Sequence, residues 1–210
     1  MLEWPDDQNT AKGLIAGPAG DLEVDVDLPT NSPRGVVVIC HPHPQQGGTK
    51  DNKVVFMLGR AATQAGFAAV RFNFRGIGKS QGEYDAGIGE VDDVRAVRQW
   101  ALQASGLTLA ALAGFSFGSA AALRSAVNEP VDKLITVGFP AAYFDTVPRP
   151  AGRWLAVFGD ADDVIDVQAS IAAVSELDPA VDVQILEHAG HFLHGRLTEL
   201  RKHAVAFLQD

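Results

Sequence analysis

A serine stands between two glycines in the segment Gly114-Phe115-Ser116-Phe117-Gly118, which fits the pattern Gly-x-Ser-x-Gly. An apolar run, residues 107–113, precedes this segment and a run of small residues follows it, which is the strand-turn-helix setting of a nucleophile elbow. In such an elbow the serine backbone is strained, and side chains two positions to either side would clash with neighbouring segments. The pattern therefore predicts Ser116 as a nucleophile. The alternative is a glycine-rich turn in which the serine is incidental.

A serine hydroxyl is almost un-ionised at neutral pH, so it needs a base within hydrogen-bond reach and an acid that orients the base. Two downstream loops carry such groups. Residues 159–165 read Gly-Asp-Ala-Asp-Asp-Val-Ile after an apolar strand candidate, and residues 187–192 read Glu-His-Ala-Gly-His-Phe after the next one. The carboxyl ends of parallel strands meet at one edge of a sheet, so we expect both loops beside the elbow. The order serine, aspartate, histidine is that of α/β-hydrolases.

At these residues the chain resembles the α/β-hydrolase superfamily. In that family the acid commonly follows a strand as Gly-x-x-Asp-x-x-Val/Ile, so the resemblance implies that Asp162 is the triad acid. The family also ends with a histidine followed by an aromatic residue, which implies that His191 is the base. We expect the neighbouring acidic and histidine residues to serve in turns, caps or loops. These alternatives are Asp145, Asp160, Asp163, His188 and His194, of which His194 is expected one turn into a helix.

Acyl transfer also needs backbone N–H donors that bind the developing oxyanion. The N–H of Phe117 is predicted as one donor, because it follows the nucleophile at the N-terminus of a helix. The loop at residues 41–49, His-Pro-His-Pro-Gln-Gln-Gly-Gly-Thr, is expected to supply the other. Pro44 has no N–H, so His43 is the preferred donor. The alternatives are Gly47 and Gly48.

The resemblance narrows when three motifs are read together: the His-Pro-His-Pro and Gly-Gly-Thr loop, Asn-Lys-Val-Val at 52–55, and Arg-Phe-Asn-Phe-Arg-Gly-Ile-Gly-Lys-Ser at 71–80. They resemble a group of small bacterial α/β-hydrolases without a cap, and the similarity covers about residues 22–208. The resemblance implies a cofactor-free mechanism but no established substrate. Residues 73–82 are expected either near the elbow or as a surface loop fixed by glycines.

The hydrophobic pattern indicates the strands that would position these residues. Residues 22–28 alternate apolar and acidic side chains, which predicts a half-solvated strand near a sheet edge. Later candidates are apolar on both faces, as in the interior of a parallel sheet covered by helices. These strand candidates are residues 35–40, 68–74, 107–113, 134–137, 154–158 and 181–186.

Helical patterns alternate with these strands and predict a doubly wound, mostly parallel α/β sheet with an antiparallel start and helices on both faces. We expect one α/β-hydrolase domain over residues 1–210. Residues 138–152 carry three prolines and are too short for a cap domain, which predicts a preference for short acyl groups. The expected helices are residues 51–65, 90–104, 116–128 and 166–175, and a C-terminal one with Leu193, Leu197, Leu200, Ala204 and Phe207 on its apolar face.

Composition limits the possible partners. The chain has 210 residues, a formal net charge of -9 and no evident basic cluster, so nucleic acid is not expected as a partner. The single cysteine, Cys40, and the lack of a signal-peptide pattern at the N-terminus predict a cytoplasmic location. Residues 99–123 carry no charge, but glycines and hydroxyl groups interrupt them, so a strand, a turn and a helix are expected rather than a membrane span. The oligomeric state is expected to be monomer or homodimer.

Together these observations predict a serine hydrolase that cleaves small carboxylic esters or thioesters through an acyl-enzyme intermediate. No cofactor and no metal are expected, because the histidine spacing matches neither His-Glu-x-x-His nor the usual zinc frameworks. The alternatives are a peptidase, amidase or acyltransferase with the same residues, or a non-catalytic binding protein on the same scaffold.

Overall fold

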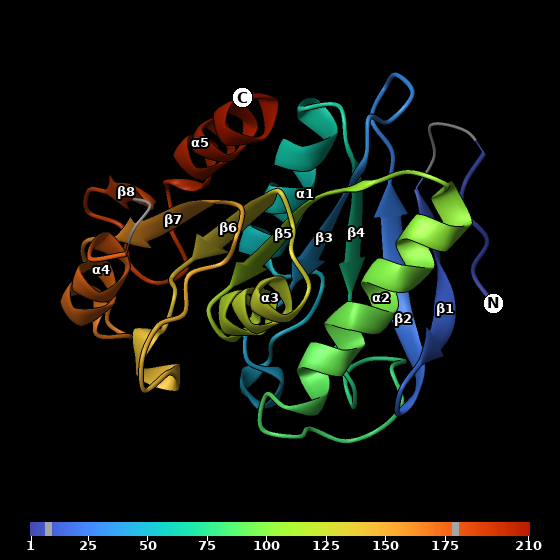
Figure 1. Cartoon of the computed structure of the whole chain (residues 1–210), viewed down its shortest axis with the longest axis horizontal. Helices are drawn as coiled ribbons and strands as arrows, with labels where there is room; N and C mark the ends of the chain where they lie inside the picture. Colours follow the sequence, from blue (N-terminus) through green and yellow to red (C-terminus); the bar gives the residue numbers. More distant parts are fainter. Residues whose placement is uncertain (7–9, 178–180) are drawn as a thin grey trace.

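A computed structural model describes residues 1–6, 10–177 and 181–210. Its centre is an eight-stranded sheet in the order β1-β2-β4-β3-β5-β6-β7-β8 (Figure 1). The pairs β1-β2 and β2-β4 are antiparallel, and every later pair is parallel. The strands are β1 (Ala11–Gly17), β2 (Gly20–Asp27), β3 (Val36–Cys40), β4 (Ala68–Phe72), β5 (Leu109–Phe115), β6 (Lys133–Val137), β7 (Arg153–Gly159) and β8 (Asp182–Leu186).

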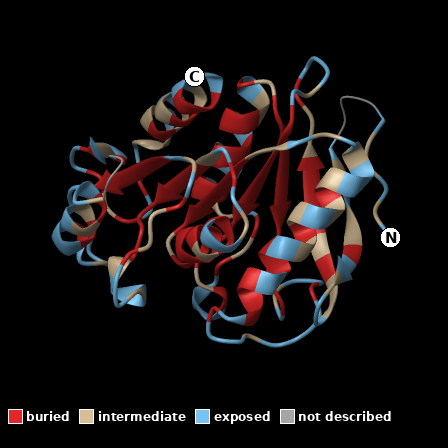
Figure 2. Ribbon diagram, viewed as in Figure 1, coloured by how far each residue is buried: buried red, intermediate tan, exposed pale blue. Residues whose placement is uncertain are grey.

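Helices cover both faces of the sheet. The apolar faces of α2, α3 and α4 pack on one side, and those of α1 and α5 pack on the other. Buried residues accordingly follow the strands and the inner faces of the helices (Figure 2). This arrangement confirms the predicted doubly wound, mostly parallel sheet. The helices are α1 (Lys53–Gln64), α2 (Gly89–Ser105), α3 (Phe117–Asn128), α4 (Val167–Ser175) and α5 (Leu197–Gln209), with the short 3₁₀ turns η1 (Pro44–Gln46) and η2 (Ala141–Tyr143).

Local capping sets several helix ends. The Asn52 side chain accepts a hydrogen bond from the Val54 N–H at the start of α1, and Asp166 accepts one from Ala169 at the start of α4. Helix α2 ends at Ser105 and is capped by Gly106, whose φ of 69° is the left-handed conformation that glycine adopts without strain. These signals explain why the predicted helix ranges lie within a few residues of the observed ones.

The first strand was not predicted, and one acidic residue of the next strand is more buried than expected. β1 carries two glycines and lacks a clear alternating pattern, yet it pairs along the outer side of β2, so β2 lies second from the sheet edge, in keeping with its expected place near an edge. Glu23 and Asp27 on the acidic face of β2 are partly exposed, as expected for a half-solvated strand, whereas Asp25 is only 1% exposed. Lys50 and Arg71 cover it with their cationic groups, at 3.1 and 3.6 Å from its carboxylate.

Two element boundaries near the predicted site also differ from expectation. Strand β5 continues to Phe115, two residues beyond the predicted end, so the strand leads directly into Ser116. Helix α5 begins at Leu197, so His194 precedes the helix instead of lying one turn inside it. Leu193, at φ 51°, belongs to the turn before α5.

The uncharged run at residues 99–123 covers the end of α2, all of β5 and the start of α3. Across the described ranges, no helix combines the length and the apolar character that a membrane crossing requires.

Candidate active site

Ser116 occupies a sharp turn between β5 and α3. Its backbone has φ 53° and ψ −122°, a conformation that is strained for any residue with a side chain. Its N–H donates to the Val137 carbonyl at 2.8 Å, so the turn remains tied to β6. The strain and the position at the carboxyl edge of the sheet are those of a nucleophile elbow.

The two glycines around Ser116 are required by close backbone approaches. A Cβ atom on Gly114 would lie 2.3 Å from the Gly118 carbonyl oxygen. A Cβ atom on Gly118 would lie 2.4 Å from the carbonyl oxygens of Cys40 and His41. The start of α3 therefore rests directly on the end of β3, where the predicted oxyanion loop begins.

Asp162 and His191 come into direct contact in the loops after β7 and β8. Asp162 Oδ2 lies 2.7 Å from His191 Nδ1, and both side chains are almost fully buried, at 1% and 3% exposed. The other carboxylate oxygen accepts hydrogen bonds from the N–H groups of Val164 and Ile165. Burial opposes ionisation of Asp162, but the hydrogen bonds from His191, Val164 and Ile165 outweigh it and hold the pKa of this carboxyl below its ordinary value. The ionised carboxylate accepts the Nδ1 proton, which leaves His191 Nε2 as the basic nitrogen.

Two neighbours place the His191 ring beside the elbow. The ring of Phe115, the residue before Ser116, lies 4.9 Å from the imidazole between centroids. On another side is Gly138, at φ 54°, where a Cβ atom would lie 3.1 Å from His191 Cε1. Gly138 directly follows Val137, the residue that accepts the Ser116 N–H. The imidazole is therefore fixed next to the predicted nucleophile.

The other acids and histidines considered from the sequence lie at the surface. Within the described residues, Asp162 is the carboxylate that bonds His191. The exposed alternatives are Asp145, Asp160, Asp163, His188 and His194.

The predicted oxyanion donors lie on adjoining segments. Among the described residues, the backbone N–H groups of His43 and Phe117 donate no hydrogen bond, and the two side-chain rings contact each other at 5.2 Å. The Gly48 N–H donates to the His43 carbonyl at 3.1 Å, so this alternative donor is already used. Gly48 also closes the loop tightly, because a Cβ atom there would lie 2.1 Å from the Pro42 carbonyl oxygen.

His41 fastens the start of this loop, a role that sequence reasoning missed. Its Nε2 accepts the Phe74 N–H at 3.0 Å, and its Nδ1 lies 2.6 Å from the Pro42 carbonyl, to which it donates. Complete burial lowers the pKa of His41 to about 4, against an opposing effect of the Pro42 carbonyl. The imidazole is thus neutral at physiological pH and links the oxyanion loop to the end of β4.

Lys50 holds the end of the same loop in place through its backbone N–H, its backbone carbonyl and its side-chain ammonium group. Its N–H donates to Asn73 Oδ1 at 2.8 Å, its carbonyl accepts from Arg71 Nη1 at 3.0 Å, and its Nζ lies 3.1 Å from Asp25. All four side chains are buried. The motif at 71–80 was the available signal, and its Asn73 holds the oxyanion loop while its glycines shape the turn that follows.

A cavity of about 540 Å³ opens beside Ser116. Its lining comes from the oxyanion loop, η2, the loop after Asp162, and α4. Neither Phe115 nor Phe117 is among its described lining residues, so these rings serve mainly in packing around the elbow. The lining residues are His43, Gln46, Ser116, Pro140, Ala141, Ala142, Tyr143, Val164, Ile165, Asp166, Ala169, Ser170 and Ala173.

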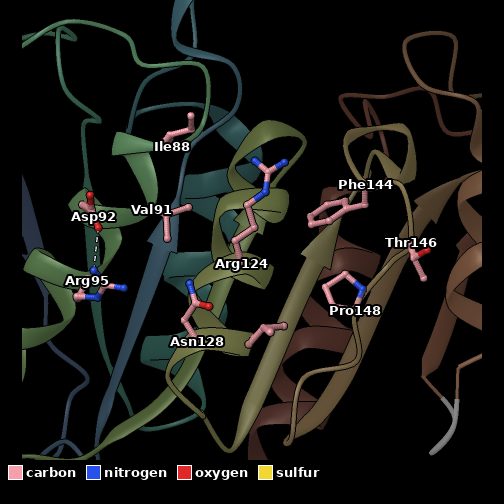
Figure 3. A pocket seen from close by; sticks show the side chains of 10 residues that line it. Ile88, Val91, Asp92, Arg95, Arg124, Asn128, Phe144, Thr146 and Pro148 are labelled. Carbon is pink, nitrogen blue, oxygen red and sulfur yellow. Dashed lines mark hydrogen bonds and ion pairs between the residues drawn. The ribbon is translucent and has the colours of Figure 1, made fainter.

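A second cavity, of about 460 Å³, lies between α2, α3 and the segment that follows η2 (Figure 3). Arg124 of α3 reaches across it, donating to the Tyr143 carbonyl at 2.9 Å, with its guanidinium 4.8 Å from the Phe144 ring centroid. Arg95 on α2 pairs with Asp92 and Glu129. The charges in this cavity are therefore largely used in internal contacts.

Comparison with known proteins agrees with this fold. Residues 20–204 match the model of the X-Pro dipeptidyl-peptidase (S15) family. An α/β serine hydrolase homologue from Coxiella burnetii is 41% identical with a TM-score of 0.91, and 98% of this chain and 99% of that one are covered. A serine hydrolase without a lid from Xanthomonas campestris is 37% identical with a TM-score of 0.90, covering 98% and 96%. An uncharacterized protein of Rickettsia prowazekii is 29% identical over 205 residues, or 89% of this chain and 83% of that protein. The chain therefore belongs to the α/β serine hydrolases and, within them, to the family described as X-Pro dipeptidyl-peptidase (S15).

Proposed function

We propose that this protein hydrolyses small carboxylic esters or thioesters through an acyl-enzyme on Ser116. The observation that carries the proposal is the buried Asp162–His191 contact beside a strained serine. A structural serine has no need of an oriented imidazole, whereas a nucleophilic serine does.

In the first half-reaction the Ser116 hydroxyl oxygen attacks the substrate carbonyl carbon, and His191 Nε2 takes the hydroxyl proton. Asp162 stabilises the imidazolium that results. When the tetrahedral intermediate collapses, the bond to the leaving oxygen or sulfur breaks and His191 returns the proton to the leaving group. The acyl group remains on Ser116.

In the second half-reaction a water attacks the acyl-enzyme carbonyl while His191 removes its proton. Collapse of the second intermediate breaks the bond to the serine oxygen, which regains a proton from His191, and releases the carboxylic acid. The N–H groups of His43 and Phe117 bind the oxyanion in both steps, each contributing about 3 to 4 kcal/mol to the transition state.

The proposed setting is the cytoplasm, with a small-molecule substrate and a monomeric or homodimeric enzyme. The single cysteine supports this setting, because Cys40 cannot form an internal disulfide; it is buried at the end of β3. Burial raises the pKa of this thiol far above its ordinary value, so it is unreactive.

Peptide-bond cleavage is a second candidate, favoured by the match to the X-Pro dipeptidyl-peptidase model. A panel of p-nitrophenyl esters, acyl thioesters and Xaa-Pro p-nitroanilides tests both candidates. We expect turnover of esters and thioesters. A higher kcat/KM for an anilide than for any ester would favour the peptidase. A protein that neither hydrolyses any member of the panel nor reacts with a fluorophosphonate would favour the third alternative, a non-catalytic binding protein.

Esterase activity is expected to survive metal removal. The proposed mechanism uses no metal, and within the described ranges no group of three or more His, Cys, Asp or Glu side chains is placed to hold a metal ion. The measurement is p-nitrophenyl butyrate hydrolysis before and after incubation with EDTA. Loss of activity that zinc restores would contradict the mechanism.

Asn73→Ala is expected to lower kcat for ester hydrolysis about tenfold or more with little change in KM. The substitution removes the acceptor of the Lys50 N–H, so the oxyanion loop loses one of its hydrogen bonds to the end of β4, and a misplaced oxyanion donor weakens transition-state binding. Asn128→Ala, at an exposed position on α3, is the matched control and should change neither constant. A wild-type kcat for Asn73→Ala would show that this anchor does not position the oxyanion hole.

A further inference from the structure

The cavity beside Ser116 has two walls that the proposed mechanism does not use. One wall is η2 with the proline before it, and the other is α4 with the loop after Asp162. The volume of about 540 Å³ is within the range of small-molecule binding sites. A chain without a cap domain thus still encloses a ligand-sized space next to its nucleophile.

The lining shows which part of a substrate the cavity faces. It includes Ser116 and His43, the proposed nucleophile and oxyanion residue, whereas His191 is not among its described residues. The leaving group receives its proton from His191, so it must lie on the side of that imidazole. Ser116 and His43 act on the substrate carbonyl, so a cavity that both residues line can hold the acyl group attached to that carbonyl.

The chemistry of the lining is mainly apolar. Proline, alanine, valine, isoleucine and tyrosine make up most of it. Two large apolar side chains are left open to solvent at its rim, with Tyr143 43% and Val164 55% exposed. When a ligand covers exposed apolar groups in a cavity, their removal from water stabilises the complex.

Charge in the cavity has one sign. Among the described lining residues, Asp166 is the one carboxylate, and no lysine or arginine is present. Asp166 Oδ1 caps α4 by accepting the Ala169 N–H at 3.0 Å. A carboxylate on the acyl group would be repelled by Asp166, because no lining cation would offset the repulsion.

Hydrogen bonds on both sides of η2 hold this wall in place, so the cavity is preformed in the ligand-free protein. Ser170 Oγ of α4 accepts the Ala141 N–H at 3.2 Å on the cavity side. On the opposite side Arg124 holds the Tyr143 carbonyl and stacks near Phe144, as Figure 3 shows for the side chains of Arg124 and Phe144. A preformed wall lowers the ordering cost of binding.

From these observations we infer that the cavity between η2 and α4 is an acyl pocket that accepts uncharged, apolar acyl groups up to about six carbons or one phenyl ring and excludes acyl groups with a terminal carboxylate. The inference rests on the proposed ester hydrolysis at Ser116. It assigns Ala169 of α4 to the pocket wall and Asp166 to charge discrimination.

Chain length is the first test. For the wild type, kcat/KM should rise from p-nitrophenyl acetate to hexanoate, by up to about fourfold for each added methylene, and should be lower for laurate below its aggregation limit. Ala169→Leu narrows the pocket and should lower the hexanoate-to-acetate ratio of kcat/KM about tenfold. Ala172→Leu, exposed on the same helix but outside the lining, should leave the ratio unchanged.

Charge is the second test. Butyryl and succinyl esters have acyl chains of equal carbon number, so their p-nitrophenyl esters differ by one carboxylate. Wild-type kcat/KM should favour the butyryl ester, and Asp166→Asn should raise the succinyl rate at least about threefold, because a nearby like charge has been removed. Asparagine caps a helix as well as aspartate does, so α4 should keep its stability.

The outcomes separate this inference from the proposed function. If wild-type protein hydrolyses acetate and is labelled by a fluorophosphonate, but Ala169→Leu and Ala172→Leu give the same hexanoate-to-acetate ratio, the pocket is wrong and the hydrolase stands. An unchanged succinyl rate in Asp166→Asn would overturn the charge discrimination. A wild type that neither turns over acetate nor takes the label would refute the hydrolase itself.

Discussion

Ser116→Ala is expected to lower kcat for p-nitrophenyl butyrate by at least about a thousandfold while leaving the fold intact. The substitution removes the oxygen that forms the acyl-enzyme, and His191 is left with no nucleophile to deprotonate. The side chain is small and only partly buried, so little packing is lost. Kinetics together with thermal unfolding of the purified variant measure both effects.

A second substitution at the same position separates chemistry from backbone strain. Ser116→Gly also removes the nucleophile, but glycine accepts a φ of 53° freely, so the free energy of unfolding should increase by about 1 kcal/mol relative to Ser116→Ala. Ser175→Ala, an exposed position on α4, is the activity control. A Ser116→Ala protein with wild-type turnover would refute the mechanism.

Asp162→Asn is expected to lower kcat by about a thousandfold to ten-thousandfold. An amide can present its NH₂ group to His191 Nδ1, which favours the wrong tautomer and removes the charge that stabilises the imidazolium. The contact being broken is short and buried, at 2.7 Å and 1% exposed for the carboxylate, so solvent cannot replace it. Ester kinetics for each aspartate variant measure the effect.

The ranking among the acidic residues is the sharper part of this prediction. Asp160→Asn, Asp163→Asn and Asp145→Asn change exposed carboxylates and should stay within about threefold of wild type. If Asp145→Asn were the most damaging, the acid would belong after β6 instead of after β7.

The sequence was most informative where chemistry depends on neighbours in the chain. The elbow around Ser116 is one such case, because the need for Gly114 and Gly118 arises within one strand-turn-helix unit. The order of acid and histidine loops is another, because parallel strands bring their carboxyl ends to one edge. The sheet, its helices and the proximity of Asp162 to His191 could therefore be anticipated.

Interactions between distant segments were not readable in the same way. The contacts that hold the end of the oxyanion loop join Asp25, Lys50 and Asn73 from three separate segments, and each residue alone resembles an ordinary polar position. For the same reason the alternating pattern of β2 did not indicate that Asp25 is buried beneath Lys50 and Arg71. Pairing of β1 depended on its neighbour more than on its own weak pattern.

The absence of a cap could be anticipated from the short, proline-rich segment at 138–152, but the space that remains could not. The segment forms η2, and this short turn faces α4 across a cavity of about 540 Å³. Neither element has a pattern that distinguishes a pocket wall from an ordinary surface. We therefore expect the size of this cavity to set the length of the longest acyl group that the enzyme prefers.

The central claim is that Ser116 is a nucleophile activated by His191. The most direct measurement is reaction with a fluorophosphonate followed by peptide mass spectrometry. We predict one phosphonylated residue, Ser116, with loss of labelling in Ser116→Ala and a strongly reduced rate of labelling in His191→Ala. Labelling at a different serine, or no labelling of a folded wild-type protein, would contradict the account.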